Sequence, residues 1–99
     1  MTRQEARILV EQEINKPSPY WPDKPELVVL DEHTREESFG WVFFYSTQAY
    51  RETGAIEHTL VGNAPIIVDK RTGELHVTGT ADPLEVYVEN YRRHGTPHL

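Results

Sequence analysis

Apolar positions recur with helical spacing at both ends of this chain and with strand-like spacing between them. Near the N-terminus this spacing predicts a helix over residues 2–16, which ends at Pro17 because proline cannot donate its amide. Near the C-terminus it predicts a helix over residues 83–94, capped by Asp82 and ended by Gly95. The two apolar stripes are formed by Ala6, Leu9, Val10 and Ile14, and by Leu84, Tyr87, Val88 and Tyr91.

Four segments between these helices have the composition of strands. They are residues 26–33, 39–46, 65–69 and 74–78, and the polar residues 34–38 are expected to form a turn between the first two. The second segment is apolar on both faces, which is typical of a central strand covered on both sides. Its Gly40 indicates a bulge or a close approach of another backbone. The last two segments are expected to pair as a hairpin through a turn that ends at Gly73.

The connections are less regular. Residues 17–25 hold four of the seven prolines, which predicts a stiff connection over the core. Trp21 lies among them, and it either covers the apolar core or forms an exposed aromatic anchor for a partner. Residues 48–52 predict a helical turn ended by Gly54, followed by an extended segment at 55–61 and a turn at 62–63. Residues 96–99 are expected to form a frayed tail.

These elements predict an α+β fold in one domain, residues 1–99. It consists of a four-stranded, mostly antiparallel sheet with an N-terminal and a C-terminal helix packed on it. Short connections favour antiparallel pairing, and we expect both helices on the same face of the sheet.

Composition restricts the function. The formal net charge is −6, with sixteen acidic and ten basic side chains, so a nucleic-acid partner is not expected. The same charge suits a basic protein partner, although it also simply keeps a small domain in solution. The chain has no cysteine, its N-terminus is charged where a signal peptide is apolar, and no apolar run approaches the roughly 20 residues that span a bilayer. We therefore expect a cytoplasmic protein with no membrane contact.

No group of residues indicates a reaction. The five histidines lack a recognised ligand spacing, so we expect no metal. Adjacent carboxyl groups such as Glu36-Glu37 are predicted to be solvated, whereas acid–base catalysis needs two carboxyl groups in different environments, one of them desolvated. No serine lies in a nucleophile motif, and no glycine-rich loop is present to hold a phosphate. We expect a protein that is not an enzyme and needs no cofactor.

An ordered set of motifs extends over about residues 39–91. It comprises Gly40-Trp-Val-Phe-Phe-Tyr-Ser46, Tyr50 with Glu52-Thr-Gly54, Gly62-Asn-Ala-Pro-Ile-Ile-Val-Asp-Lys70, Thr72-Gly-Glu74, His76 and Gly79-Thr-Ala81, followed by Pro83, Glu85 and Tyr87. As a set in this order the motifs resemble the immunity protein 35 family, which includes small YrhB-like bacterial proteins. Most of these residues are explained by turns, packing and caps, so the resemblance marks a shared fold and transfers no catalytic residue.

The resemblance implies an immunity protein that binds and neutralises a cognate toxin of a bacterial polymorphic toxin system. It also leaves open an alternative, a stand-alone chaperone-like or stress accessory protein without a toxin partner. Partner contacts are expected on exposed positions outside the shared motifs, and the oligomeric state is not predicted. The candidate partner-binding residues are Trp21, Glu36, Glu37, Tyr50 and Glu52.

Overall fold

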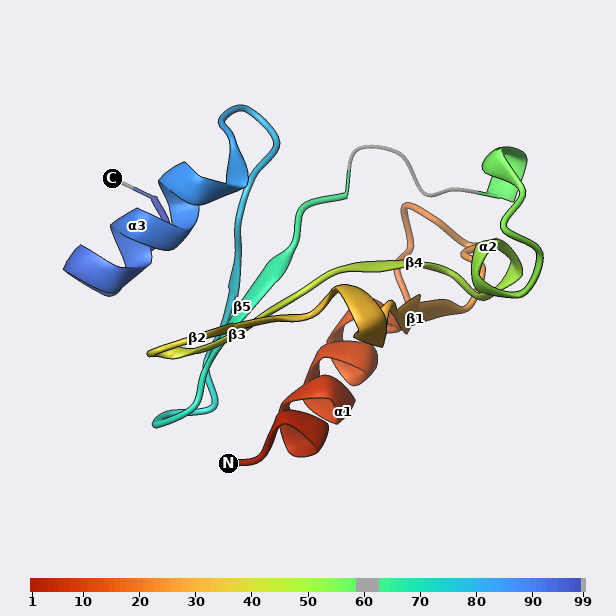
Figure 1. Cartoon of the computed structure of the whole chain (residues 1–99). Coiled ribbons are helices and arrows are strands. Elements are labelled where there is room, and N and C mark those ends of the chain that lie inside the picture. The colour runs from red at the N-terminus through yellow and green to blue at the C-terminus, as the bar shows by residue number, and fades with distance from the viewer. Residues whose placement is uncertain (59–62, 99) are drawn as a thin grey trace.

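The computed structural model describes residues 1–58 and 63–98. Three α-helices, two short 3-10 helices and six strands follow one another along this part of the chain (Figure 1). In order they are α1 (Arg3–Ile14), β1 (Leu27–Val29), η1 (Asp31–His33), β2 (Arg35–Glu37), β3 (Gly40–Phe43), β4 (Tyr45–Thr47), α2 (Gln48–Thr53), η2 (Ile56–His58), β5 (Ile66–Asp69), β6 (Leu75–Val77) and α3 (Leu84–His94).

The strands form a four-stranded antiparallel sheet and a two-stranded extension of it. The four-stranded sheet has the order β2-β3-β5-β6, and β1 pairs with β4. The predicted strand at 39–46 is divided at Phe44, after which the chain exchanges β5 for β1 as its partner. The predicted turn at 34–38 was wrong, because Arg35–Glu37 pairs with β3 as an edge strand. The α+β fold and the terminal helices are confirmed.

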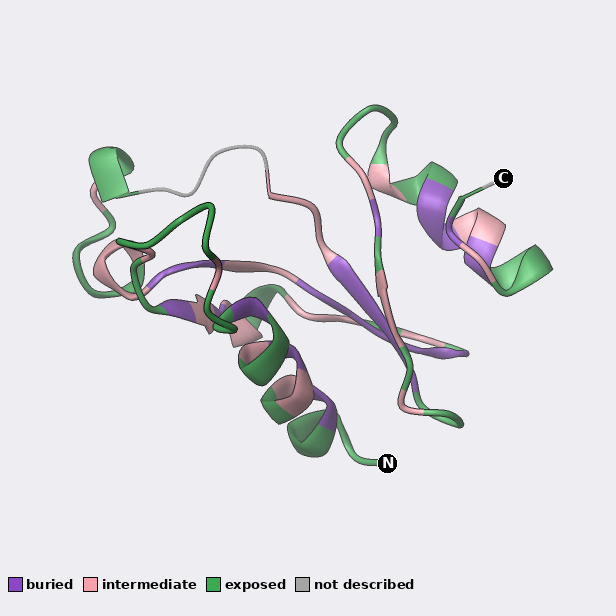
Figure 2. Cartoon of the chain, turned by 180° about the vertical axis from the view of Figure 1, so that it is seen from behind, coloured by how far each residue is buried: buried purple, intermediate pink, exposed green. Residues whose placement is uncertain are grey.

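The two terminal helices lie on opposite faces of the sheet, not on one face as the sequence suggested (Figure 1). The cause is that β3 and β5 are buried along their whole length, so each presents apolar side chains to both faces. The α1 face contains Ala6, Val10, Ile14, Leu27, Val29, Trp41, Phe43, Ile66 and Val68. The α3 face contains Phe39, Val42, Ile67, Val88 and Tyr91, and Figure 2 shows the buried band continuing from the sheet onto the inner sides of both helices.

Gly40 is required where β3 meets β5. A Cβ atom there would lie 2.0 Å from the Val68 carbonyl oxygen, and the φ angle of +152° disfavours other residues. The close approach of another backbone that the sequence indicated at Gly40 is therefore confirmed.

The helix ends follow the sequence except at the start of α3. Thr2 and Glu5 form a capping box at α1, and Gly95 ends α3 in the left-handed region. Asp82 does not cap α3 with its side chain, since Pro83 occupies the cap position without a side-chain bond. The Asp82 amide instead donates to the Tyr87 hydroxyl at 3.2 Å.

The C-terminal tail is packed against the fold, contrary to the frayed tail expected from the sequence. Pro97 is buried, and its carbonyl accepts a hydrogen bond from the Asn90 side chain at 3.1 Å. The His98 Nε2 atom lies 2.9 Å from the carbonyl oxygen of Val77 in the edge strand β6. Residues 96–98 therefore join α3 to that edge.

A buried hydrogen bond connects α3 to the end of β5. The Tyr91 hydroxyl donates to Asp69 Oδ2 at 2.8 Å, and the Arg71 amide donates to Asp69 Oδ1 at 2.8 Å. Burial alone would raise the pKa of Asp69, but these hydrogen bonds outweigh it and hold the pKa below its usual value. Burial, together with the bond to Asp69, raises the pKa of Tyr91 to about 12.

Trp41→Ala is expected to lower the free energy of unfolding by about 3–5 kcal/mol, because the indole is 6% exposed and lies in the cluster under α1. Trp21→Ala is the matched control, since Trp21 is 40% exposed and belongs to neither core cluster. Urea denaturation measures both, and losses of equal size would contradict the assignment of Trp41 to the core.

Stability is expected to fall at both extremes of pH through the Tyr91–Asp69 pair. The pKa of Tyr91 in the folded protein lies above its ordinary value of 10.0. Its contribution to the free energy of unfolding is therefore complete below pH 10 and is lost between pH 10 and about 12. The folded pKa of Asp69 lies below its ordinary 3.8, so its contribution is present above that pH and is lost as the pH falls further.

Tyr91→Phe tests this pH dependence. It should remove the alkaline component and cost about 1–3 kcal/mol at neutral pH, because the Asp69 carboxylate loses a donor. Tyr20→Phe is the control, since Tyr20 is 95% exposed and should leave the profile unchanged. Urea denaturation from pH 6 to pH 11.5 provides the measurement, and parallel profiles for the wild type and Tyr91→Phe above pH 10 would refute the linkage.

Candidate functional site

The proline-rich segment folds into two consecutive turns that form a projecting loop. The Trp21 amide donates to the Ser18 carbonyl at 3.2 Å, and the Lys24 amide donates to the Trp21 carbonyl at 3.2 Å. Pro19 and Pro22 each occupy the second position of a turn, where the fixed φ angle of proline is favourable. We call residues 17–26 the double-turn loop.

The base of the double-turn loop is closed by one asparagine. The Asn15 side chain donates from Nδ2 to the Leu27 carbonyl at 2.8 Å and accepts the Leu27 amide at Oδ1 at 2.8 Å. This two-way contact imitates a strand pairing and joins the end of α1 to the start of β1. Together with the two turns it leaves the loop little conformational freedom.

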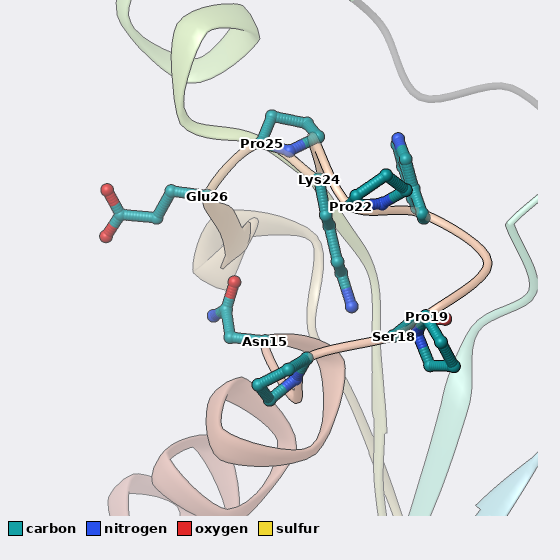
Figure 3. Close-up of a pocket in the computed structure, with 9 residues that line it drawn as sticks. Asn15, Ser18, Pro19, Pro22, Lys24, Pro25 and Glu26 are labelled. Carbon is teal, nitrogen blue, oxygen red and sulfur yellow. The ribbon is translucent and has the colours of Figure 1, made fainter.

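The double-turn loop displays aromatic side chains. Tyr20 is 95% exposed, and Trp21, at 40%, lies outside both core clusters, so Trp21 does not cover the core. Lys24 Nζ lies 6.0 Å from the centre of the Trp21 ring and donates to the Lys16 carbonyl at 3.3 Å. The loop and Asn15 surround an open hollow of about 830 Å³ (Figure 3). Of the two interpretations of Trp21, the exposed aromatic is the one observed.

Tyr50 and Glu52 lie on α2, at the same end of the molecule as the double-turn loop. The Gln48 amide at the start of α2 donates to the Glu26 carbonyl at 2.9 Å, which fixes the helix beside the end of the loop. Glu52 is exposed and accepts a hydrogen bond from the Gln48 side chain at 2.8 Å. Tyr50 is half-buried and lines a separate cavity of about 360 Å³.

Glu36 and Glu37 lie at the opposite end of the long strand. They pair with the start of β3, whereas α2 follows Thr47, so the two groups are separated by about 23 Å along the strand. Glu37 bonds to Arg35 at 3.0 Å and to Arg92 on α3 at 2.9 Å. Glu36 is exposed and has no side-chain partner among the described residues. The structure therefore gives Glu37 a bracing role between β2 and α3.

Negative charge is concentrated in the middle of the chain. Residues 17–58 carry eight acidic and three basic side chains, which gives −5 of the total of −6. Two of those three basic side chains form ion pairs, since Arg35 pairs with Glu37 and Arg51 pairs with Glu32 at 3.4 Å. This part of the surface repels anions and attracts cationic groups.

Sequence reasoning identified Trp21 but missed three features of this end. These are Tyr20, the Asn15 clamp and the cavity beside Tyr50. Each turn of the loop has a proline at its second position, so Tyr20 occupies the third position of the first turn. This proline pattern was the signal in the sequence that could have indicated an exposed Tyr20. The expected extended segment at 55–61 was wrong at Ile56–His58, which is a 3-10 helix, while residues 59–61 and Gly62 of the expected turn at 62–63 lie outside the described residues.

The described part of the chain contains neither a metal-binding cluster nor a membrane-spanning helix. Within residues 1–58 and 63–98, no three His, Asp or Glu side chains are grouped so as to hold a metal ion. Over the same residues, no helix combines the length and the apolar character needed to cross a membrane.

Comparison with known proteins gives a family and a relative. The sequence model of the family described as Immunity protein 35 matches residues 5–94. A protein of Escherichia coli (strain K12), named "Uncharacterized protein YrhB", is 43% identical over 76 residues, which cover 77% of this chain and 80% of that protein. No solved structure matches the chain.

The two neighbouring glutamates of β2 provide a test of their separate roles. Glu37→Gln is expected to lower the free energy of unfolding by about 1 kcal/mol, because Arg35 and Arg92 each lose one of their two carboxylate partners. Glu36→Gln should change it by less than about 0.5 kcal/mol. Urea denaturation at low ionic strength compares them, and equal losses would show that Glu37 does not brace α3.

Proposed function

Because the chain belongs to the immunity protein 35 family, we propose that it binds and neutralises the cognate toxin of a bacterial polymorphic toxin system. It would act in the cytoplasm of the producing cell, by occupying the active site of the toxin or an adjacent face. The proposal includes no catalytic step, no cofactor and no nucleic-acid or membrane partner.

The observation that carries this proposal is the rigid double-turn loop with its exposed aromatic residues. Trp and Tyr are enriched among the residues that dominate binding energy in protein interfaces. Their carrier is already ordered by two turns and by the Asn15 clamp, so binding costs less conformational entropy. A standard interface needs about 800 Å² from each partner, which is a modest fraction of the 6245 Å² surface.

The charge distribution supports a basic partner. Asp23, Glu26 and Glu52 are exposed on or beside the double-turn loop, and they belong to the segment that carries most of the negative charge. Acidic groups at the rim of an interface raise the association rate of a basic partner and make that rate fall with salt.

The chaperone-like alternative is less well supported. It requires an accessible apolar surface, and the face of β3 that carries Trp41 and Phe43 is the apolar surface that the sheet could offer. These side chains are 6% and 0% exposed and are packed in the cluster under α1. Clients would therefore meet this face only after α1 had been displaced.

Trp21→Ala is expected to weaken binding of the toxin encoded by a neighbouring gene by at least about 2 kcal/mol, as for a central interface aromatic. Val86→Ala is the control, because Val86 has nearly the same exposure, 41%, but lies on α3. Calorimetric titration at low and high salt measures the affinity, and the association rate should fall as salt is raised.

Three outcomes would count against parts of this proposal. Absence of binding to any product of a neighbouring toxin gene would remove the toxin-neutralising function. Equal affinities of Trp21→Ala and the wild type for the toxin would show that the double-turn loop lies outside the interface. An association rate unaffected by salt would remove the electrostatic contribution.

A further inference from the structure

One apolar part of the sheet lies beyond the reach of α3. This helix packs over Phe39, Val42 and Ile67 of the four-stranded sheet. The long strand continues past Phe44 into β4, which pairs with β1, and Figure 1 shows α3 well away from this two-stranded extension. The cavity of about 360 Å³ opens here, at the junction of the two sheets.

The walls of this cavity are mainly apolar and aromatic. Leu30, Phe44, Tyr45 and Tyr50 contribute from three different parts of the chain: the end of β1, the junction of β3 and β4, and α2. The Tyr45 side chain itself packs against the cluster under α1, on the other face of the strand from Phe44. The volume lies within the range of about 300–1,000 Å³ that is typical of small-molecule sites.

Two polar groups in the lining have free hydrogen-bonding capacity. Asn63 donates from Nδ2 to the Tyr45 carbonyl at 2.8 Å, which orients the amide and leaves its oxygen as an acceptor. The side chain of His33 makes no hydrogen bond or ion pair with any residue in the described part of the chain. A neutral imidazole supplies one acceptor nitrogen.

We propose that this cavity binds a small, uncharged aromatic molecule of one or two rings that carries an N–H or O–H donor, as indoles and phenols do. Aromatic rings pack favourably against the Phe44 and Tyr50 rings in offset or edge-to-face arrangements. The donor of the ligand meets the acceptors of Asn63 and His33. This binding activity does not depend on the proposed toxin partner.

The surroundings select against charged ligands. The negative charge of residues 17–58 disfavours an anion. None of the described residues that line the cavity carries a carboxylate, so a cation would lose water without gaining an ion pair there. A neutral ring with one donor avoids both costs.

Titration of the isotopically labelled protein with indole, followed by NMR, tests the proposal. We expect saturable shifts confined to the lining residues, a dissociation constant below about 1 mM, and nuclear Overhauser contacts from indole to the Phe44 and Tyr50 rings. 1-Methylindole, which has no N–H group, should bind several-fold more weakly.

Two variants make the test specific. Tyr50→Ala removes one wall and should raise the dissociation constant at least about tenfold. Ile56→Ala should not change it, because Ile56 is 85% exposed in η2 and does not line the cavity. The amide spectrum of each variant verifies its fold.

The proposal would be overturned by shifts that do not saturate or that spread over both faces of the sheet. It would also be overturned if Tyr50→Ala, with an intact spectrum, bound indole as tightly as the wild type. Equal binding of indole and 1-methylindole would disprove the hydrogen-bond requirement. The contacts to Phe44 in the wild type keep the test decisive if Tyr50→Ala does not fold.

Discussion

The central constraint on this fold is a pair of neighbouring strands, β3 and β5, that is buried on both faces. A sheet that is apolar on both sides has to be covered on both sides, so the two terminal helices are divided between the faces. The helix α1 covers Trp41 and Phe43, and α3 covers Val42 and Ile67. Because α3 spans only the four-stranded part, no helix of the described residues covers one apolar face of the two-stranded extension, and the cavity beside Tyr50 lies there. The two-sided burial of β3 and β5 therefore explains both the core and the cavity beside Tyr50.

The two ends of the molecule differ in how their charges are used. At the β2 end, Arg35 and Arg92 are both paired with Glu37, and each has a further partner in Glu85 or Glu89 of α3, so these charges hold α3 against the sheet. At the end that carries α2 and the double-turn loop, exposed carboxylates outnumber the free basic groups and lie beside exposed aromatic residues. A charge already paired inside the protein gains little from a partner, whereas an unpaired exposed charge still acts on an approaching one. The loop end is thus the better candidate for recognition.

Local signals in the sequence predicted the local structure well. The Gly54 and Gly95 helix ends and the hairpin of β5 and β6 follow from residues within a few positions of one another. The errors arose where the deciding partner is distant in sequence. The polar segment at β2 is a strand because β3 offers it an edge and Arg92, 55 residues away, satisfies Glu37. Both helices were assigned to one face although the two-sided β3 strand already indicated coverage of both.

The candidate site shows the same limit. Trp21 was recognisable because prolines surround it, but whether it faced the core or the solvent depended on the Asn15–Leu27 clamp, which joins residues 12 positions apart. Tyr50 and Glu52 were selected together, yet Tyr50 lines a cavity and Glu52 is exposed, since helical positions two residues apart point in different directions. A sequence motif that specifies a fold does not state directly which way such a side chain points. The direction is decided by how the elements of the fold pack together. Recognition by this protein therefore depends on residues whose exposure is decided by the tertiary structure, and the rigid loop keeps that exposure fixed before any partner arrives.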